Sequence, residues 1–278
     1  MGTLINVRGK YVEYRSVGKS DKVALILNGG HTNCDSPFGH ENLFVKLGYR
    51  LIIPSRPGYG KTPSRSGKTA EEFADTIYSF LNQLGIDSVV LVGVSAAGRT
   101  ALQFAGRYPL RVNKLILQSA IVLDDFPDKV TKATSYLIFN PLVEKFTWGL
   151  IRAFSKITPD IMLREFMSGL STLKPDVVLS QLTPTERRSI LDFILISRSG
   201  SGFLNDLKHR CGDLDRITAP TLVIDSKFDG SKSPLHAEYA ISNIHNSELM
   251  ASNAESHLIW FSKENSEIES KITEFLMM

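Results

Sequence analysis

Ser95 stands in a setting where a serine could act as a nucleophile. It follows a valine-rich apolar run at residues 89–94 and precedes a segment with helical character. A strand, a tight turn and a helix form the setting of a nucleophile elbow, which strains the backbone of its serine and therefore requires small neighbours. Gly93, Ala97 and Gly98 meet that requirement. An ordinary turn between a strand and a helix would contain the same residues, so the assignment depends on partners elsewhere in the chain.

A serine hydroxyl becomes nucleophilic at neutral pH when a histidine accepts its proton. A carboxylate must orient that histidine and stabilise its charged form. In an open parallel sheet, reactive groups gather in the loops that follow the carboxyl ends of strands. His257 follows the last expected strand by a short loop, and Asp229 lies in the loop after the strand that begins behind Pro220. These positions predict a catalytic set of Ser95, Asp229 and His257, in that chain order.

Other histidines and acids compete for these two roles. Among the six histidines, His31 also lies at the end of an expected strand. A surface or structural role is expected for the remaining four: His40, His209, His236 and His245. Asp225 is expected to be the last residue of its strand, whereas Asp124 and Asp125 are the fallback for the acid. Asp229 is preferred because it lies within the loop itself.

The elements that would position these residues alternate between strands and helices. Strands are expected at residues 3–7, 11–16, 23–28, 49–54, 89–94, 114–118, 221–225 and 248–251. Helices are expected at residues 42–47, 70–84, 99–108, 233–244 and 258–275. Thr69 and Glu72 fit a capping box at the start of the second of these helices, which ends at Gly85. The alternation is typical of a parallel α/β sheet.

The alternation stops near Leu123 and resumes at Pro220. The segment between them is mostly helical, and prolines stand where helices could begin: Pro141, Pro159, Pro175 and Pro184. Thr183 and Glu186 fit a second capping box, with a proline at the first helical position, which is a strong start signal. An insertion of this kind between two sheet strands predicts a helical cap over one edge of the sheet.

The expected domain organisation follows from this insertion. Residues 1–122 and 213–278 would form the core, and residues 123–212 would form the cap. A membrane-active amphipathic segment is the alternative interpretation of residues 146–151, although cap helices need the same apolar face.

Composition limits the classes of function. The 278 residues are 42% hydrophobic and 22% charged, which is ordinary for a globular chain with a sizeable core. The net charge of +3 is small and the basic residues are dispersed, so nucleic-acid binding is not expected. No apolar run approaches the roughly 18 residues that span a bilayer, and the first residues lack the apolar core of a secretory signal. Cys34 and Cys211 form no C-x-x-C pair. We therefore expect a cytoplasmic protein without a metal or redox motif.

The order of nucleophile, acid and histidine resembles that of the α/β-hydrolase superfamily, and the resemblance covers the whole chain. Residues 28–31 resemble the family's H-G-G or H-G-x oxyanion loop, and residues 55–62 resemble its D-x-P-G-x-G-x-S loop. Residues 215–229 are similar to the strand and loop that present the family's acid. The resemblance implies an α/β-hydrolase fold, in which helices flank a mostly parallel central sheet and a helical cap is inserted.

The resemblance also implies roles for further residues. The backbone N–H groups of Gly30 and Ala96 would stabilise an oxyanion. The cap and the loop that carries His31, Asn33 and Cys34 would shape the substrate pocket. The implied activity is that of a serine hydrolase, which needs no cofactor or metal and acts through an acyl-enzyme on a small ester, amide or related acyl substrate. The expected partner is a small-molecule substrate; a homodimer is left open.

Three positions depart from the family's usual pattern. Asn28 replaces a histidine, Ser55 replaces an aspartate and Ala97 replaces a glycine. The elbow lacks a nucleophilic aspartate, which argues against the dehalogenase and epoxide-hydrolase branch. Carbon–carbon bond hydrolysis, aminopeptidase activity and acyl transfer remain alternatives, because this fold supports all of them. A non-catalytic ligand-binding protein on the same fold is the alternative from another class.

Overall fold

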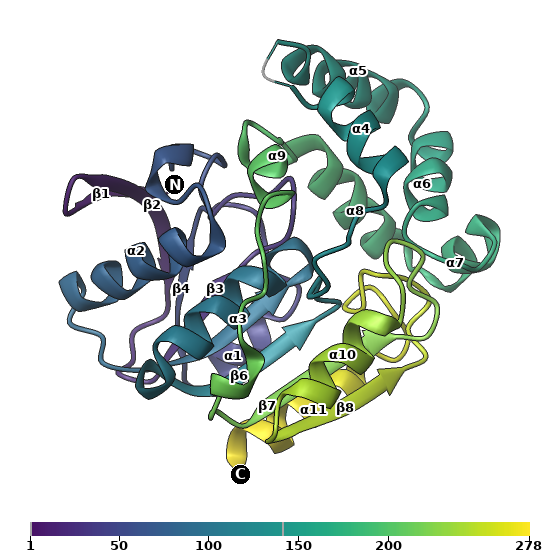
Figure 1. Cartoon of the computed structure of the whole chain (residues 1–278). Helices are drawn as coiled ribbons and strands as arrows, with labels where there is room; N and C mark the ends of the chain where they lie inside the picture. Colours follow the sequence, from purple (N-terminus) through teal and green to yellow (C-terminus); the bar gives the residue numbers. More distant parts are fainter. Residues whose placement is uncertain (1, 141) are drawn as a thin grey trace.

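The computed structural model describes residues 2–140 and 142–278, and within them a sheet of eight strands forms the centre (Figure 1). The strands are β1 (Thr3–Val7), β2 (Lys10–Val17), β3 (Val23–Leu27), β4 (Arg50–Pro54), β5 (Val89–Val94), β6 (Val112–Gln118), β7 (Thr221–Ser226) and β8 (Ser247–Ser252). Their order across the sheet is β1-β2-β4-β3-β5-β6-β7-β8. β2 is antiparallel to both β1 and β4, whereas every pair from β4 to β8 is parallel. This mostly parallel sheet confirms the predicted fold class.

The central strands are buried on both faces of the sheet. Every residue of β3 and of β5 is buried, which explains their uninterrupted apolar sequences. Because side chains alternate across a strand, Leu25 and Leu27 belong to one hydrophobic core and Ala24 and Ile26 to the other. The sheet therefore separates two cores, each of which needs its own layer of helices.

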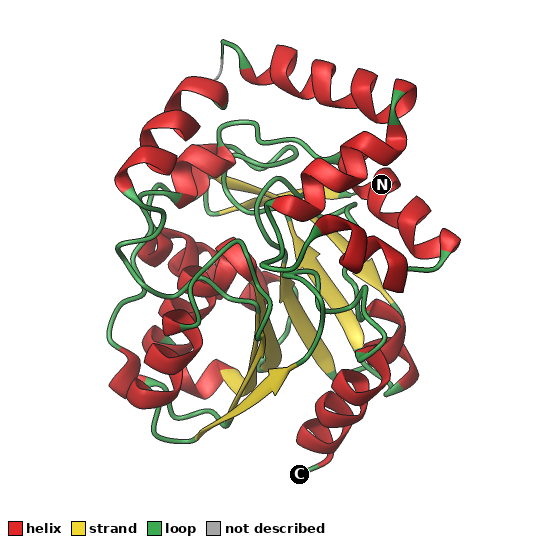
Figure 2. Cartoon of the chain, turned by 90° about the vertical axis from the view of Figure 1, so that its right-hand side faces the viewer, coloured by secondary structure: helices red, strands yellow, loops and turns green. Residues whose placement is uncertain are grey.

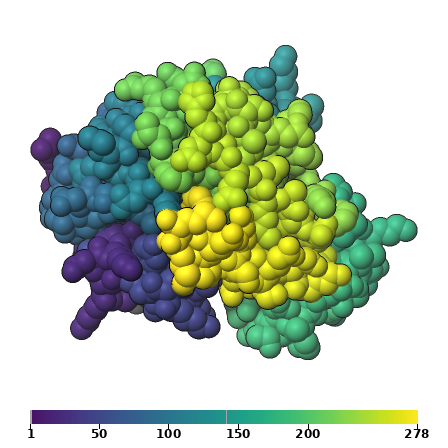
Figure 3. Space-filling model, turned by 90° about the horizontal axis from the view of Figure 1, so that it is seen from below, coloured from purple at the N-terminus to yellow at the C-terminus, as the bar shows by residue number. Residues whose placement is uncertain are grey.

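Helices cover the two faces of the sheet. The helices of this part are α1 (Glu41–Lys46), α2 (Ala70–Gln83), α3 (Gly98–Arg107), α10 (Leu235–Asn243) and α11 (Asn265–Met277). Side chains of α2, α3 and α10 enter one core, and side chains of α1 and α11 enter the other. The C-terminal helix occupies the middle of the lower face, beside the N-terminal segments (Figure 3). Among the described residues, no helix combines the length and the apolar character that crossing a bilayer requires.

A further group of helices lies between β6 and β7 in the chain and above the sheet (Figure 2). They are α4 (Lys129–Ile138), α5 (Glu144–Ile157), α6 (Pro159–Ser168), α7 (Pro175–Gln181), α8 (Pro184–Ile196) and α9 (Gly202–Asp206). Pro159, Pro175 and Pro184 are first residues of helices, as predicted, and Thr183 and Glu186 form the predicted capping box. Pro141 lies outside the described residues.

Two predicted helix boundaries are wrong. α10 begins at Leu235 rather than at residue 233, because Pro234 occupies the N-cap position. α11 begins at Asn265 rather than at residue 258. Residues 258–264 suggest a helix because they are rich in apolar side chains, but Leu258 packs into the core of the inserted helices and Ile259 packs under the sheet. Tertiary packing of this turn overrides the local pattern.

The register of the parallel strands brings several loops to one edge. Val94 pairs with Gln118, and Gln118 pairs with Ile224 of β7. Ser226 at the end of β7 pairs with Ser252 at the end of β8. The loops that follow β5, β6, β7 and β8 therefore begin side by side, beneath the inserted helices, which is where open parallel sheets place their sites.

Candidate active site

Ser95 occupies a strained turn between β5 and α3. Its φ angle is +50°, in the left-handed region that residues other than glycine rarely adopt. The small neighbours are required by close contacts: a Cβ on Gly93 would lie 2.6 Å from the Cβ of Ala101, and one on Gly98 would lie 2.5 Å from the carbonyl oxygen of Ile121. Ala97 is fully buried, so its methyl group fits the elbow. The local geometry is that of a nucleophile elbow.

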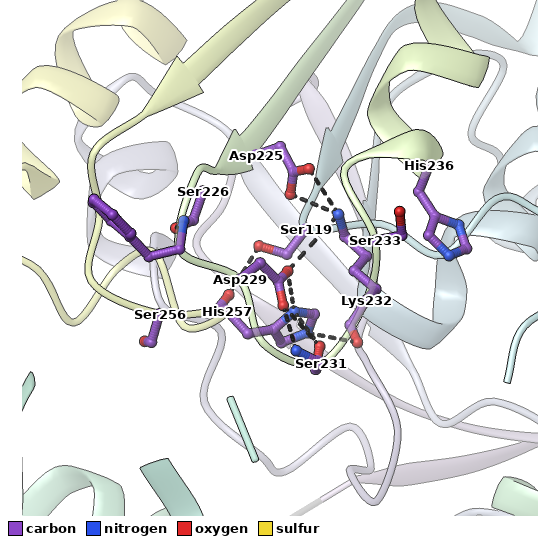
Figure 4. Close-up of polar contacts among 12 residues, drawn as sticks. Ser119, Asp225, Ser226, Asp229, Ser231, Lys232, Ser233, His236, Ser256 and His257 are labelled. Atoms are coloured by element: carbon purple, nitrogen blue, oxygen red, sulfur yellow. Dashed lines mark hydrogen bonds and ion pairs between the residues drawn. The ribbon is translucent and has the colours of Figure 1, made fainter. Parts of the chain in front are cut away.

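The structure brings Ser95, His257 and Asp229 together from the loops after β5, β8 and β7. The Oγ of Ser95 lies 2.8 Å from Nε2 of His257, and Nδ1 of the same ring lies 2.7 Å from Oδ2 of Asp229. Figure 4 shows the second of these contacts, with both side chains buried. In this arrangement the histidine can accept the serine proton while the carboxylate fixes its tautomer.

The carboxylate of Asp229 is held in its charged form. The N–H of Ser231 donates to Oδ1 over 2.8 Å, and the Oγ of Ser231 lies 3.0 Å from the same oxygen. Burial by itself raises the pKa of Asp229, but the hydrogen bond and charge of His257, together with the ammonium of Lys232, hold that pKa below its ordinary value. The acid is therefore ionised at neutral pH, as an orienting carboxylate must be.

A buried ion pair lies behind this acid and was not predicted from the sequence. The Nζ of Lys232 lies 2.7 and 2.8 Å from the two carboxylate oxygens of Asp225, and 3.7 Å from Oδ2 of Asp229 (Figure 4). Burial raises the pKa of Asp225 and the charge of Lys232 opposes that rise. β7 ends at Ser226, one residue later than predicted, so Asp225 lies within the strand, and its carboxylate contacts the lysine.

The link between α6 and α7 holds two loops in place: the acid loop after β7, which carries Asp229, and the histidine loop after β8, which carries His257. The carbonyl of Leu170 accepts the N–H of His257 over 2.8 Å and the N–H of Gly230 over 3.2 Å. Ser171 donates its hydroxyl to the carbonyl of Glu255 and forms an isolated β-bridge with Asp229. A Cβ on Gly230 would lie 2.6 Å from the carbonyl carbon of Ser171, so the glycine permits this close approach. This contact was not predicted from the sequence. The glycine at position 230 is the one local feature of the acid loop that indicates a close approach of another backbone.

Ser95 and His257 open onto a cavity of about 240 Å³ beneath the inserted helices. Its wall is mostly apolar and rich in rings, which include Phe126, Trp148, Phe166, Phe193, Phe203 and Trp260. A wider hollow of about 390 Å³ lies at the other end of β6 and β7, where Lys114, Pro220 and Thr221 line it, far from the serine. The chemistry of the elbow belongs to the smaller cavity.

The loop after β3 places its expected pocket residues in different surroundings. His31 lines the cavity, whereas Asn33 and Cys34 do not, and for these two residues the expectation is wrong. Asn33 turns the chain by accepting the N–H of Ser36 with its side-chain oxygen over 3.1 Å. Cys34 is fully buried, and its N–H donates to the Oγ of Ser55 over 2.9 Å. The turn at Asn33 directs the chain away from the cavity and into the protein.

Gly30 and Ala96 are neighbours at the cavity wall. A Cβ on Gly30 would lie 3.7 Å from the Cβ of Ala96, and one on Gly29 would lie 3.1 Å from the Cβ of Ser95. The loop after β3 thus passes directly over the elbow. His31 continues it with a φ of +61°, a left-handed conformation. This is where backbone N–H groups would have to lie to stabilise an oxyanion.

The two loop positions that depart from the family's pattern serve as braces. The side-chain amide of Asn28 donates to the carbonyl oxygens of Asn33 and Ser36, over 3.3 and 3.2 Å. The hydroxyl of Ser55 donates to Oε2 of Glu13 over 2.9 Å. Both side chains therefore hold loops in shape without reaching the serine.

The competing histidines and the fallback acid lie elsewhere. His40 contacts Gln118 and Asn265, His209 contacts Thr100 and Asn205, and the Nδ1 of His236 accepts the N–H groups of Val122 and Leu123. All three of these rings are buried structural groups. Asp124 accepts the N–H of Cys211 over 3.1 Å and pairs with Arg210. The structure thus places Asp229, and not Asp124, beside His257.

One group of possible metal ligands occurs among the described residues. It comprises Glu13, Cys34 and Asp35, away from the cavity. The carboxylate of Glu13 already accepts the hydroxyl of Ser55 and the N–H of Lys61. Burial raises the pKa of Cys34 to about 11, so this residue is a thiol and not the thiolate that binds metals. These donors suit a structural hydrogen-bond cluster better than a metal.

Comparison with protein families matches residues 23–261 to a family described as alpha/beta hydrolase fold. The chain is 35% identical over 277 residues to the "Uncharacterized hydrolase YcgS" of Bacillus subtilis, and the match covers 98% of this chain and 97% of that protein. It is 28% identical over 226 residues to a 2-hydroxy-6-oxononadienedioate/2-hydroxy-6-oxononatrienedioate hydrolase of Paraburkholderia phymatum, with 78% and 74% covered.

Solved structures share the fold. An alpha/beta hydrolase fold protein from Nakamurella multipartita superposes with a TM-score of 0.84 at 24% identity, and the match covers 99% of each chain. An esterase from Exiguobacterium antarcticum gives a TM-score of 0.71 at 22% identity, with both chains covered completely (100%). At these identities the likeness concerns the fold alone.

Proposed function

This chain is a hydrolase that belongs to the alpha/beta hydrolase fold family, and we propose that it is a serine hydrolase acting through an acyl-enzyme. Its substrate would be a small ester, amide or related acyl compound. The observation that carries the proposal is the continuous contact from Ser95 through His257 to Asp229, at 2.8 and 2.7 Å. This contact ends at a serine that opens onto a cavity.

The proposed reaction has two halves. His257 accepts the Ser95 proton at Nε2 while the serine oxygen attacks the substrate carbonyl, and the backbone N–H groups of Gly30 and Ala96 stabilise the oxyanion. The charged histidine then gives its proton to the leaving group, which departs and leaves the acyl group on Ser95. A water molecule loses a proton to the same nitrogen and attacks the acyl-enzyme, which releases the acid and restores the serine.

The inserted helices take the role of a cap in this proposal. The residues of the cavity wall come both from these helices, as with Phe166 and Phe193, and from the loops of the core, as with His31. A substrate would be enclosed between the two layers. The cap predicted at residues 123–212 would therefore select the substrate together with these loops of the core.

Carbon–carbon bond hydrolysis is a second candidate, because relatives at 25–28% identity are named as hydrolases of 2-hydroxy-6-oxo acids. A serine, a histidine and an acid are compatible with that reaction on this fold. The two candidates differ in the bond that is broken. Turnover of a simple ester favours the ester or amide hydrolase. Turnover of a vinylogous 1,5-diketone, without turnover of the ester, favours the carbon–carbon bond hydrolase.

A fluorophosphonate probe tests the proposed nucleophile. We expect the probe to label the folded wild-type protein at one site, and Ser95→Ala to abolish labelling. Ser180→Ala, at an exposed serine on α7, is the matched control and should label like the wild type. A folded wild-type protein that remains unlabelled, or labelling that survives in Ser95→Ala, would refute the assignment.

A further inference from the structure

We propose that the cavity selects substrates whose buried acyl part is uncharged and apolar, and that it rejects acyl groups that end in a carboxylate. This inference rests on the proposed serine hydrolase function and adds the class of substrate to it. It follows from three observations: the residue types of the cavity wall, the partners that the nearby cations already have, and the hydrogen bonds of His31.

No described residue of the cavity wall is an aspartate, glutamate, lysine or arginine. The polar atoms come from hydroxyl, amide, imidazole and backbone groups, and aromatic rings supply much of the remaining surface. A carboxylate that leaves water needs a cation or several hydrogen-bond donors in exchange. An apolar acyl group gains from the same transfer, because it exchanges water for contact with rings.

The cations behind the wall are already engaged. Arg56 pairs with Asp206 and also donates to the carbonyl oxygens of Asn28 and Gly29, over 2.7 and 2.9 Å. The guanidinium of Arg198 makes two bonds of 2.9 Å to the carboxylate of Glu144. Turning either group towards a substrate would leave a buried acid unpaired, which is costly.

Two further cations near the site also have partners within the protein. Lys232 is bound to Asp225, with both side chains buried. Arg99 donates to the carbonyl oxygens of Leu123 and Phe126, of which Phe126 lines the cavity. None of these four side chains contributes to the described cavity wall, and each makes hydrogen bonds to other groups of the protein.

Apart from His257 of the proposed catalytic set, His31 is the one described wall residue that could become a cation, and its contacts keep it neutral. Its ring stacks on Phe203 with centroids 4.3 Å apart, and the rings of Phe139 and Trp148 lie 4.9 and 5.3 Å away. The indole N–H of Trp148 donates to the Oγ of Ser199 over 2.7 Å. That hydroxyl lies 2.8 Å from Nδ1 of His31, so its own hydrogen is free to donate to the ring.

This chain of donors fixes the tautomer of His31. With Nδ1 as an acceptor, the proton of the neutral ring sits on Nε2. Burial lowers the pKa of His31 to about 4, so the ring carries no charge at neutral pH. The charges of Asp206, Arg56 and Glu144 also act on this pKa: the two acids oppose the shift and the arginine adds to it. An uncharged N–H can bind an ester, ether or amide oxygen but gives a carboxylate no counter-charge.

This substrate class would distinguish the chain from relatives that are named after a substrate ending in dioate. That ending denotes a compound with two carboxylates, one at each end. The acyl part of such a compound therefore still carries a carboxylate when it enters the pocket. The relative from Paraburkholderia phymatum has such a name. We expect the substrate of this chain to lack the distal carboxylate.

Three p-nitrophenyl esters of similar length test this inference. The hexanoate ends in a methyl group, the hemiadipate replaces that methyl with a carboxylate, and the adipamate replaces it with a neutral amide of the same shape. We expect kcat/KM for the hemiadipate to fall at least about 100-fold below that for the hexanoate, with the adipamate in between. The ratio should stay constant between about pH 6 and pH 8, because His31 remains neutral there.

A matched pair of variants on α8 tests the cause. Phe193→Lys adds a cation at the cavity wall, whereas Ile196→Lys adds the same charge to an exposed position of the same helix that does not line the cavity. We expect Phe193→Lys to raise the hemiadipate-to-hexanoate ratio at least about tenfold and Ile196→Lys to leave it unchanged. Thr131→Lys on α4, also at the wall, replaces Phe193→Lys if that variant does not fold.

The outcomes distinguish this inference from the function on which it rests. If Ser95-dependent hydrolysis of the hexanoate is absent, the proposed function fails. If that hydrolysis is present but the wild type cleaves the hemiadipate as fast as the adipamate, the substrate class alone is wrong. A folded, hexanoate-active lysine variant with an unchanged ratio would also overturn the substrate class.

Discussion

Replacement of Lys232 by methionine should cost far more stability than its place in a loop suggests. The ammonium makes contacts of 2.7 and 2.8 Å to Asp225, with side-chain exposures of 1% and 8%, so solvent screens the pair very little. Lys232→Met leaves the Asp225 carboxylate buried without a partner. Removing one member of a buried ion pair costs about 3–5 kcal/mol, which is a large part of a typical folding free energy of roughly 5–15 kcal/mol.

A surface pair provides the matched control. Lys271 lies 2.7 Å from Glu248, but their side chains are 24% and 40% exposed. Because exposed pairs contribute only about 0–1 kcal/mol, Lys271→Met should change stability little, although the contact distance is the same. The double variant Asp225→Asn/Lys232→Met should recover much of the loss, since no buried charge remains unpaired.

Urea denaturation followed by circular dichroism measures these free energies of unfolding. The loss in Lys232→Met should also depend on pH. Burial raises the folded-state pKa of Asp225, and without the lysine it rises further, so the folded state favours the protonated acid. Stability should therefore recover as pH falls below that raised pKa towards the ordinary Asp value of about 3.9. Equal losses in Lys232→Met and Lys271→Met, or no gain in the double variant, would refute this reasoning.

Three further predictions follow from the site and its surroundings. Asp229→Asn should lower kcat by about 10⁴-fold because it disturbs the tautomer of the base, whereas Asp124→Asn should leave kcat nearly unchanged in the same ester assay; the reverse ranking would mean that the acid is misassigned. Gly93→Ala should destabilise the fold by about 1–3 kcal/mol, because its Cβ would lie 2.6 Å from that of Ala101. Gly149→Ala, which adds a methyl group in open space on α5, should instead stabilise the fold slightly. Thermal unfolding measures both changes. Cys34 should resist iodoacetamide at about pH 8 in the folded protein and react in urea, since burial raises its pKa to about 11; rapid alkylation of the folded protein would contradict its placement.

The fold could be predicted because its signals are local. The apolar run of β3 predicts a strand buried on both faces, and the capping box at Thr183 predicts the start of α8. The start of α11 could not be found in the same way. Residues 258–261 are apolar for reasons of tertiary packing: Leu258 contributes to the core of the inserted helices, and Trp260 lies at the cavity wall.

The site was predictable where topology determines position. Ser95, Asp229 and His257 follow three strands of a parallel sheet, so the fold brings their loops to one edge. Contacts from the insertion were not predictable, because they depend on how α4–α9 pack above that edge. The hydrogen bond between the N–H of His257 and the carbonyl of Leu170 is of this kind. The pairing of Lys232 with Asp225 lies within the core part of the chain and depends on the path of the loop after β7.

The same limit explains the error at Asn33 and Cys34. Proximity in sequence to His31 suggested that all three residues face the substrate. The direction of the chain after His31 is set by side-chain contacts of Asn33 and by the brace between Cys34 and Ser55, which a sequence pattern does not encode.

Trapping of the acyl-enzyme tests the central claim most directly. The protein is mixed with p-nitrophenyl hexanoate, quenched in acid within the first turnovers, and analysed by intact and peptide mass spectrometry. We expect wild-type protein to gain the mass of one hexanoyl group, located on Ser95. Steady hydrolysis without an adduct on Ser95, or hydrolysis at the wild-type rate in Ser95→Ala, would contradict it.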